Sequence, residues 1–178
     1  MIRTKYTVNK ETLAILPARA IDYRAIVLEK QQTYHIRQTP LAIIKNACIE
    51  IGFSTLKGKQ EAVKHHTDLK YKLPIPISIA QQIYAFPTQS ILNYDCSWIF
   101  YHHIMHVGKL PSNNKPTQTT ITFKNKREMN INVSPYIIQQ QMNRTFLCTQ
   151  QIESVFRSPE LSPANMTKSN GKPLKSYF

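Results

Sequence analysis

The stretch from Asp95 to Val107 places the strongest constraint on how this chain can fold. It is rich in β-branched and aromatic residues, a composition typical of a β-strand. Apolar side chains occupy both alternating positions, so both faces of such a strand would have to be buried. The sequence therefore predicts a central strand of a sheet, covered on each side by other parts of the chain.

The pair Thr39-Pro40 predicts the start of a helix, because the threonine hydroxyl can cap the first turn and proline has no N–H to leave unpaired there. We expect this helix to end at Gly52, and a loop over 52–58 and a short helix over 59–66 to follow. A loop of that length is too long for the turn of a helix-turn-helix. The predicted apolar stripe of the first helix is Leu41, Ile44, Cys48 and Ile51.

Ser134-Pro135 repeats the same signal and predicts a second long helix, ending near Gln151. Its expected apolar stripe consists of Ile138, Met142 and Phe146, at intervals of four residues.

Several short segments predict further strands. Apolar runs between residues 11 and 37 indicate two or three strands, and Ile83 to Phe86 indicates another. The alternating segments 117–123 and 128–133 predict a hairpin. A proline-containing segment at residues 74–76 cannot lie in the middle of a sheet.

The predicted fold class is α+β, a mostly antiparallel sheet with two main helices packed on it. One domain is expected over residues 1–156, because 178 residues suffice for one core. Residues 157–178 are rich in Ser, Pro, Asn and Lys without apolar periodicity, so we expect a disordered basic tail.

Charge is the first indication of function. The chain has 23 Lys and Arg against 10 Asp and Glu, a net charge of +13 that favours binding to polyanions such as nucleic acid. Codons of an AT-rich genome explain part of the lysine content, but Asp and Glu also have AT-permissive codons. Residues 57–72 carry five basic and two acidic groups and residues 109–144 six and one, a sum of 11 − 3 = +8.

The sequence offers little support for catalysis, metal binding or membrane insertion. It has no nucleophile elbow, Walker loop or dinucleotide-binding fingerprint, so no enzyme activity and no cofactor are expected. On a strand, His102 and His106 would be about 13 Å apart, too far to share a metal ion. No stretch approaches 18 apolar residues, so no membrane segment is expected. Three scattered cysteines, Cys48, Cys96 and Cys148, suit buried reduced thiols in a cytoplasmic protein.

The order of several short sequence pieces between residues 11 and 150 resembles the ComK family of competence transcription factors. The most specific piece is Phe86-Pro87-Thr88 followed by Cys96 and Trp98-Ile99. The other matching pieces are Ile15-Leu16-Pro17, Pro40-Leu41, Cys48, Gly52, Ser54, Gly58-Lys59, Pro74 to Ile77, His106-Val107, Thr120 to Phe123 with Asn125, and Asn143-Arg144-Thr145.

The resemblance implies an activator of DNA-uptake genes in the cytoplasm, associated with the nucleoid. Such proteins bind AT-rich duplex boxes largely through the minor groove, as dimers or pairs of dimers. Members of the family are also degraded through a protease adaptor. This chain departs from the family in two places: its tail, residues 157–178, lacks the hydrophobic segment that the adaptor contacts, and its basic loop near Leu56-Lys57 has one extra residue. An RNA-binding or ribosome-associated basic module is the alternative, with a zinc-dependent hydrolase third.

The residues expected to contact DNA come mainly from the predicted hairpin tip and from the loop after the first helix. A slender two-stranded ribbon can carry a positive tip into a groove, where lysine and arginine would meet the negative potential of an AT tract. A solvated turn would have the same local composition. The candidate DNA-binding residues are Lys124, Asn125, Lys126, Arg127, Lys57, Lys59, Lys64 and Arg144.

Overall fold

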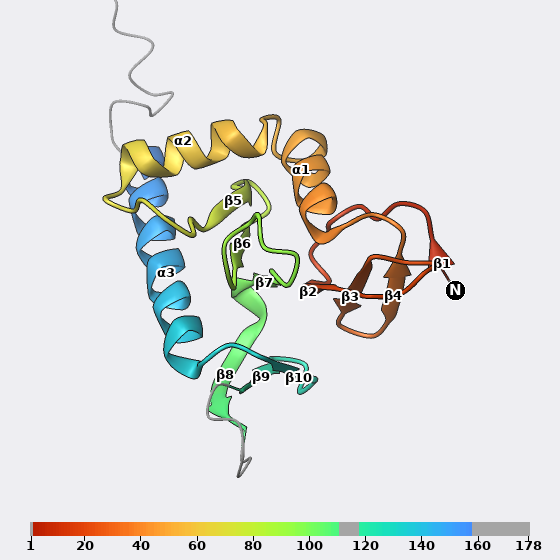
Figure 1. Ribbon diagram of the computed structural model, residues 1–178. Coiled ribbons are helices and arrows are strands. Elements are labelled where there is room, and N and C mark those ends of the chain that lie inside the picture. Colours follow the sequence, from red (N-terminus) through yellow and green to blue (C-terminus); the bar gives the residue numbers. More distant parts are fainter. Residues whose placement is uncertain (1, 111–117, 158–178) are drawn as a thin grey trace, which may run out of the picture.

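The computed structural model describes residues 2–110 and 118–157, which fold into two sheets and three α-helices (Figure 1). The larger sheet has seven strands in the order β1-β4-β3-β2-β7-β6-β5, and the smaller has three in the order β10-β9-β8. The strands are β1 (Ile2–Arg3), β2 (Thr12–Pro17), β3 (Ala25–Glu29), β4 (Thr33–Ile36), β5 (Ile75–Ser78), β6 (Ile83–Pro87), β7 (Trp98–Phe100), β8 (Ile104–Lys109), β9 (Thr119–Phe123) and β10 (Glu128–Ile131); the helices are α1 (Pro40–Glu50), α2 (Leu56–His66) and α3 (Pro135–Arg157).

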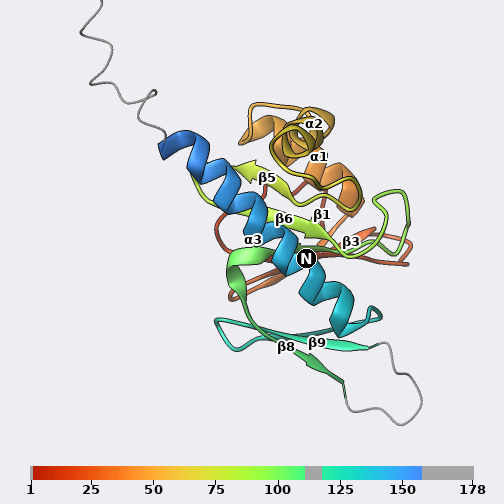
Figure 2. The same ribbon diagram turned by 90° about the vertical axis from the view of Figure 1, so that its left-hand side faces the viewer.

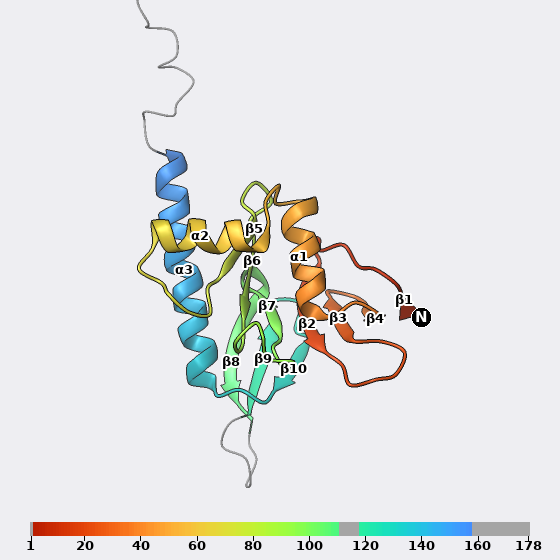
Figure 3. The same cartoon turned by 45° about the horizontal axis from the view of Figure 1, so that its top comes forward.

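The elements stack in layers around two apolar clusters. Helices α1 and α2 cover one face of the seven-stranded sheet, and the three-stranded sheet packs on the other (Figures 1 and 3). Helix α3 runs along the side and contacts β6, β8 and α2. All described strand pairs are antiparallel except β1 with β4, so the predicted α+β class with a mostly antiparallel sheet is confirmed.

Strand β7 occupies the central position predicted for this part of the chain. Trp98 and Phe100 belong to the cluster beneath the helices, while Ile99 belongs to the cluster shared with the small sheet. The prediction of one strand from Asp95 to Val107 is wrong before Trp98 and beyond Phe100. Residues 95–97 are not strand, residues 101–103 form a 3-10 turn, and the chain then enters the second sheet as β8. Beyond the turn Ile104 is buried but Met105 is exposed, so only the β7 part needs cover on both faces.

Helix α1 begins as predicted, with the Thr39 hydroxyl accepting from the Ala42 N–H. The buried face of α1 differs from the predicted apolar stripe, since Leu41 and Ile51 are only half-buried. Position 52 requires glycine because the backbone of β5 comes very close to it: a Cβ there would lie 2.2 Å from the Ile77 carbonyl oxygen. The fully buried side chains of α1 are Ile43, Ile44, Ala47 and Cys48.

Helix α2 begins three residues earlier than predicted, at Leu56. The Thr55 side chain caps it by accepting from the Gly58 N–H at 3.0 Å. The loop predicted over 52–58 is confirmed for residues 52–55 and wrong for residues 56–58, since only residues 51–55 separate α1 from α2. The signal for the earlier start was a threonine cap, which the glycine at position 58 obscured.

Helix α3 starts at Pro135, with the Ser134 hydroxyl accepting from the Ile137 N–H, but it extends past the predicted end to residue 157. The extra turns form because Ile152 packs into the main core with Cys148. Phe146, predicted to be buried, is 50% exposed. The true buried face is partly polar: it contains Gln141, Thr145 and Thr149 beside Ile138, Cys148 and Ile152.

The remaining strand predictions are largely confirmed. Three strands lie between residues 11 and 37, and β9 and β10 form the expected hairpin. Pro76 lies on β5, an edge strand, where its missing N–H is tolerated. Strand β1 was not predicted. No helix in the described ranges is long and apolar enough to cross a bilayer, and the predicted disordered tail at 158–178 lies outside the described residues.

Candidate nucleic-acid interface

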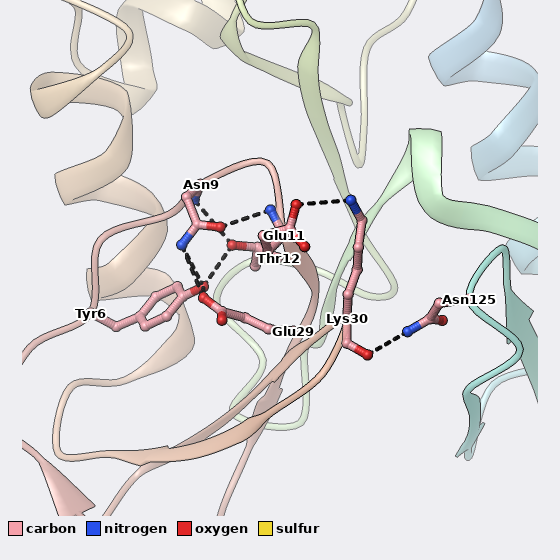
Figure 4. A network of polar contacts seen from close by, with 7 residues as sticks. All are labelled: Tyr6, Asn9, Glu11, Thr12, Glu29, Lys30 and Asn125. Carbon is pink, nitrogen blue, oxygen red and sulfur yellow. Dashed lines mark hydrogen bonds and ion pairs between the residues drawn. The ribbon is translucent and has the colours of Figure 1, made fainter.

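The tip of the β9–β10 hairpin docks on two other parts of the chain. The Asn125 side chain donates a hydrogen bond of 2.6 Å to the carbonyl oxygen of Lys30, in the β3–β4 turn (Figure 4). The backbone N–H of Lys124 donates to the carbonyl oxygen of His103 at 2.8 Å. The tip is thus held in place rather than projecting freely.

Arg127 makes the strongest of these attachments. Its guanidinium donates to the carbonyl oxygens of Glu29 and Gln32, at 2.6 and 3.0 Å, and to the Thr33 hydroxyl at 2.9 Å. A guanidinium has donors in a fixed planar fork, which suits one side chain to several acceptors around a turn. Arg127 therefore has a structural role that the sequence did not indicate.

Lys124 and Lys126 are the two exposed cations of the tip. Lys126 has φ of 66°, a left-handed conformation that places it at the turn itself. Of the four predicted tip residues, Asn125 and Arg127 attach the hairpin to the β3–β4 turn by hydrogen bonds. The two lysines are exposed and available to a ligand.

The turn on which the tip docks is itself braced by a polar network (Figure 4). The Tyr6 hydroxyl donates to the Glu29 carboxylate at 2.6 Å and shares a hydrogen bond with the Thr12 hydroxyl. Burial, followed by the hydrogen bond to Glu29, raises the pKa of Tyr6 well above its ordinary value. Asn9 also donates to Glu29, so the β3–β4 turn is a firm base for the tip.

A second basic group lies on α2 and the segment leading to β5, and we name it the α2–β5 surface. Lys64, Lys70 and Lys72 line a cavity of about 440 Å³ there. Tyr71 also lines it and is 79% exposed, which leaves its ring free to contact a ligand. Aromatic rings among lysines are common where proteins bind nucleic acid.

Side chains of helix α3 hold the segment that leads from α2 to β5. The buried Gln141 donates to the carbonyl oxygens of Lys72 and Pro87, at 3.0 and 2.7 Å. Arg144 donates to the carbonyl oxygen of Tyr71 and to the Gln141 side chain. Arg144, predicted to contact DNA, is therefore half-buried and anchors the segment that carries the lysines.

The two remaining predicted residues differ in exposure. Lys57 is exposed and forms a surface ion pair with Glu61 at 3.7 Å. Lys59 is half-buried, and this burial lowers its pKa. Of the two, Lys57 is the better placed to reach a phosphate.

The structure does not bring the two basic groups together. Figures 1 and 2 both show α2 at one end of the molecule and the β9–β10 hairpin at the other. The sequence indicated both groups by their charge but could not indicate their separation. It also gave no signal for Tyr71, whose importance comes from its exposure between lysines.

The histidines and cysteines do not assemble into a metal site. Within residues 2–110 and 118–157, no three His, Cys, Asp or Glu side chains are grouped to hold an ion. Burial raises the pKa of Cys48 and Cys148 to about 11 and also raises that of Cys96, so the described cysteines are buried thiols. The strand spacing used in the sequence argument does not apply to His102, which lies in the 3-10 turn.

The described residues form a basic α+β fold whose surface includes two separate groups of exposed lysines. The chain belongs to the ComK family, because the sequence matches the family described as ComK protein over residues 3–156. It is also 29% identical, over 142 residues, to a protein of Bacillus subtilis (strain 168) named "Competence transcription factor". That alignment covers 79% of this chain and 71% of the relative. No solved structure matches.

Proposed function

We propose that this protein is a DNA-binding regulator of transcription that controls competence genes. The observation that carries the proposal is the family match over residues 3–156, which covers nearly all described elements. The name of the Bacillus subtilis relative supports the link to competence and to transcription. The net charge of +13 supports a nucleic-acid partner.

We further propose that the DNA is AT-rich and is bound largely through its minor groove. The chain has 16 Lys and 7 Arg, and three of the arginines, Arg19, Arg127 and Arg144, hydrogen-bond within the fold. Bidentate arginine contacts to guanine are the commonest specific contacts in the major groove. Exposed lysines suit phosphates and the negative potential of a narrow AT-rich minor groove.

Each basic surface has a proposed part in binding. The tip, with Lys124 and Lys126, is held by hydrogen bonds to the β3–β4 turn and to His103, so it can approach a groove in its folded position. The α2–β5 surface can contact phosphates through its lysines and a sugar or base through Tyr71. Because the two surfaces lie apart, the proposed homodimer or pair of dimers would contact a longer stretch of DNA than one surface covers.

Competition binding experiments test which DNA sequences the protein prefers and which groove it binds. A labelled AT-rich duplex of about 30 base pairs should be displaced by unlabelled AT-rich duplex at much lower concentration than by a GC-rich duplex of equal length. Netropsin, which occupies the AT minor groove, should displace the protein. Equal competition by both duplexes would contradict AT preference, and preference for RNA that depends on the 2′-hydroxyl would favour the RNA-binding alternative.

Matched variants test the two surfaces. Lys124→Gln/Lys126→Gln and Lys64→Gln/Lys70→Gln/Lys72→Gln should each weaken binding, while Lys5→Gln/Lys45→Gln, at exposed positions elsewhere, serves as the control. Arg127 is left intact because it holds the hairpin. Affinity that falls equally in the control would indicate only a general effect of charge.

A further inference from the structure

A cavity of about 250 Å³ lies beside the base of the hairpin tip, outside both surfaces described above. Four cationic or potentially cationic side chains line it: Lys10, Lys30, His102 and His103. Part of its floor is formed by the buried side chains Tyr84 and Phe100. Among the described residues that line it there is no carboxylate.

The groups around this cavity are good donors for an anion. Lys10 is exposed, and Lys30 forms an ion pair of 2.8 Å with Glu11 (Figure 4), which is not one of the lining residues. In the part of the chain that the structure describes, the buried Nε2 atom of His102 has no hydrogen-bond partner. An unpaired buried nitrogen is costly, so a rotation of the His102 ring that turns this atom toward a ligand would be favoured.

We propose that this cavity binds a phosphate group. Lysine ammonium groups are charge-assisted donors to phosphate oxygens, and an imidazole becomes one when it takes up a proton. The volume is below the range of cavities that take drug-sized ligands, and the aromatic floor can accept a small organic group attached to the phosphate. Terminal amides of Asn9, Gln81 and Gln82 complete the polar rim.

The position of the cavity couples it to the tip. Two of its lining residues, Lys30 and His103, carry the carbonyl oxygens that hold Asn125 and the Lys124 N–H. A phosphate that bridges Lys30 and His103 would tie these two supports together and reduce the motion of the tip. Binding should therefore slow hydrogen exchange at the Lys124 amide.

The phosphate can come from two sources, which an experiment can separate. One is the backbone of a bound duplex, a case that rests on the proposed function. The other is a small phosphorylated molecule, a case that stands without DNA and would make the cavity an effector site for the tip.

Side-chain NMR of His102 and His103 in the full chain tests the proposal. The probes are adenosine 5′-monophosphate, inorganic phosphate, adenosine as a neutral control, and an AT-rich duplex. Saturable shifts of both histidines with a phosphate-bearing probe, but not with adenosine, are expected. Shifts with adenosine monophosphate or inorganic phosphate identify the small-molecule source, whereas shifts only with duplex identify the DNA backbone. No shift with any probe overturns the proposal, and DNA binding without such shifts leaves the proposed function intact.

Two variants locate the binding. Lys10→Gln changes an exposed side chain and should weaken the effective probe at least fivefold, with Lys45→Gln, exposed on α1, as the matched control. His103→Gln should weaken it further and abolish the slower exchange at Lys124. If His103→Gln does not fold, Lys10→Gln alone decides. Unchanged affinity in Lys10→Gln, or an equal loss in Lys45→Gln, overturns the site.

Discussion

At the scale of single residues, a side chain whose charge suits DNA can also hold the fold together. Arg127 illustrates this, since its guanidinium joins β10 to three acceptors in and next to the β3–β4 turn. The acceptors are far away in sequence, and local composition gives no sign of them.

We predict that Arg127→Ala lowers the free energy of unfolding by about 2 kcal/mol, because three hydrogen bonds to a charged group are lost, one of them to the part-buried Glu29 carbonyl oxygen. The neighbouring exposed change Lys124→Ala should stay within about 0.5 kcal/mol of the parent. Urea denaturation measures both. Equal stability of the two variants would contradict the structural role of Arg127.

The two histidines of the 3-10 turn make a prediction about pH. Burial lowers the pKa of both below the ordinary value of 6.5. The charge of Lys124 lowers the pKa of His102 further, whereas Glu153 raises it. Lys30 and His102 lower the pKa of His103, whereas the backbone of Lys10 and the charge of Glu11 raise it. As pH falls through 6.5, the unfolded chain takes up protons more readily than the folded one, so stability should fall.

The free energy of unfolding is therefore expected to decrease from pH 7.5 to pH 5.5, and His102→Gln/His103→Gln should reduce the size of that decrease. Urea titrations at the two pH values measure it. His65→Gln/His66→Gln, exposed on α2, is the control and should leave the decrease unchanged. A double variant with the same pH dependence as the parent would show that other groups are responsible.

At the scale of whole elements, helix α3 is a support for the basic segment as well as part of the core. Gln141 is 1% exposed and donates to the carbonyl oxygens of Lys72 and Pro87. It thereby ties the end of the lysine-bearing segment to the end of β6.

We predict that Gln141→Met, similar in size but without donors, destabilises the protein by about 3 kcal/mol because two carbonyl groups lose their partner. Since the segment is released as well, DNA affinity should fall although no lysine is changed. Thermal melting and duplex titration measure the two effects. Gln139→Met, at an exposed position of the same helix, should change neither.

Elements defined by interactions between residues close in sequence were predicted better than elements defined by contacts between distant segments. Caps and turns are local, so Thr39, Ser134 and the β9–β10 hairpin were recognisable. The buried face of α3 was not, because Gln141 and Thr145 are counted as polar in any apolar periodicity. The break after Phe100 was also missed, since residues on either side of the 3-10 turn have similar compositions but belong to different sheets.

The candidate site was predictable only in part for the same reason. Charge located the lysines of the tip and of the α2–β5 surface, because charge can be counted along a sequence. The packing of distant segments decides which basic residues remain exposed: Arg127 and Arg144 hydrogen-bond within the fold, and Lys59 is half-buried.

At the scale of the whole molecule, the separation of the two basic surfaces governs the expected salt dependence of DNA binding. Each phosphate contact contributes about −0.9 to the slope of log affinity against log salt. Removing the three lysines of the α2–β5 surface should make the slope less steep by up to about 2.7, and removing the two of the tip by up to about 1.8.

Because these surfaces lie at opposite ends of the molecule (Figures 1 and 2), the length of the duplex should decide which effect is seen. On a duplex of about one helical turn, roughly 10 base pairs, only one of the two variants is expected to change the slope. On a duplex of about 30 base pairs, bound by bending or by more than one chain, both should change it. Fluorescence anisotropy across a salt series measures the slopes. Equal effects of both variants on the short duplex would mean that the two surfaces act as a single contact.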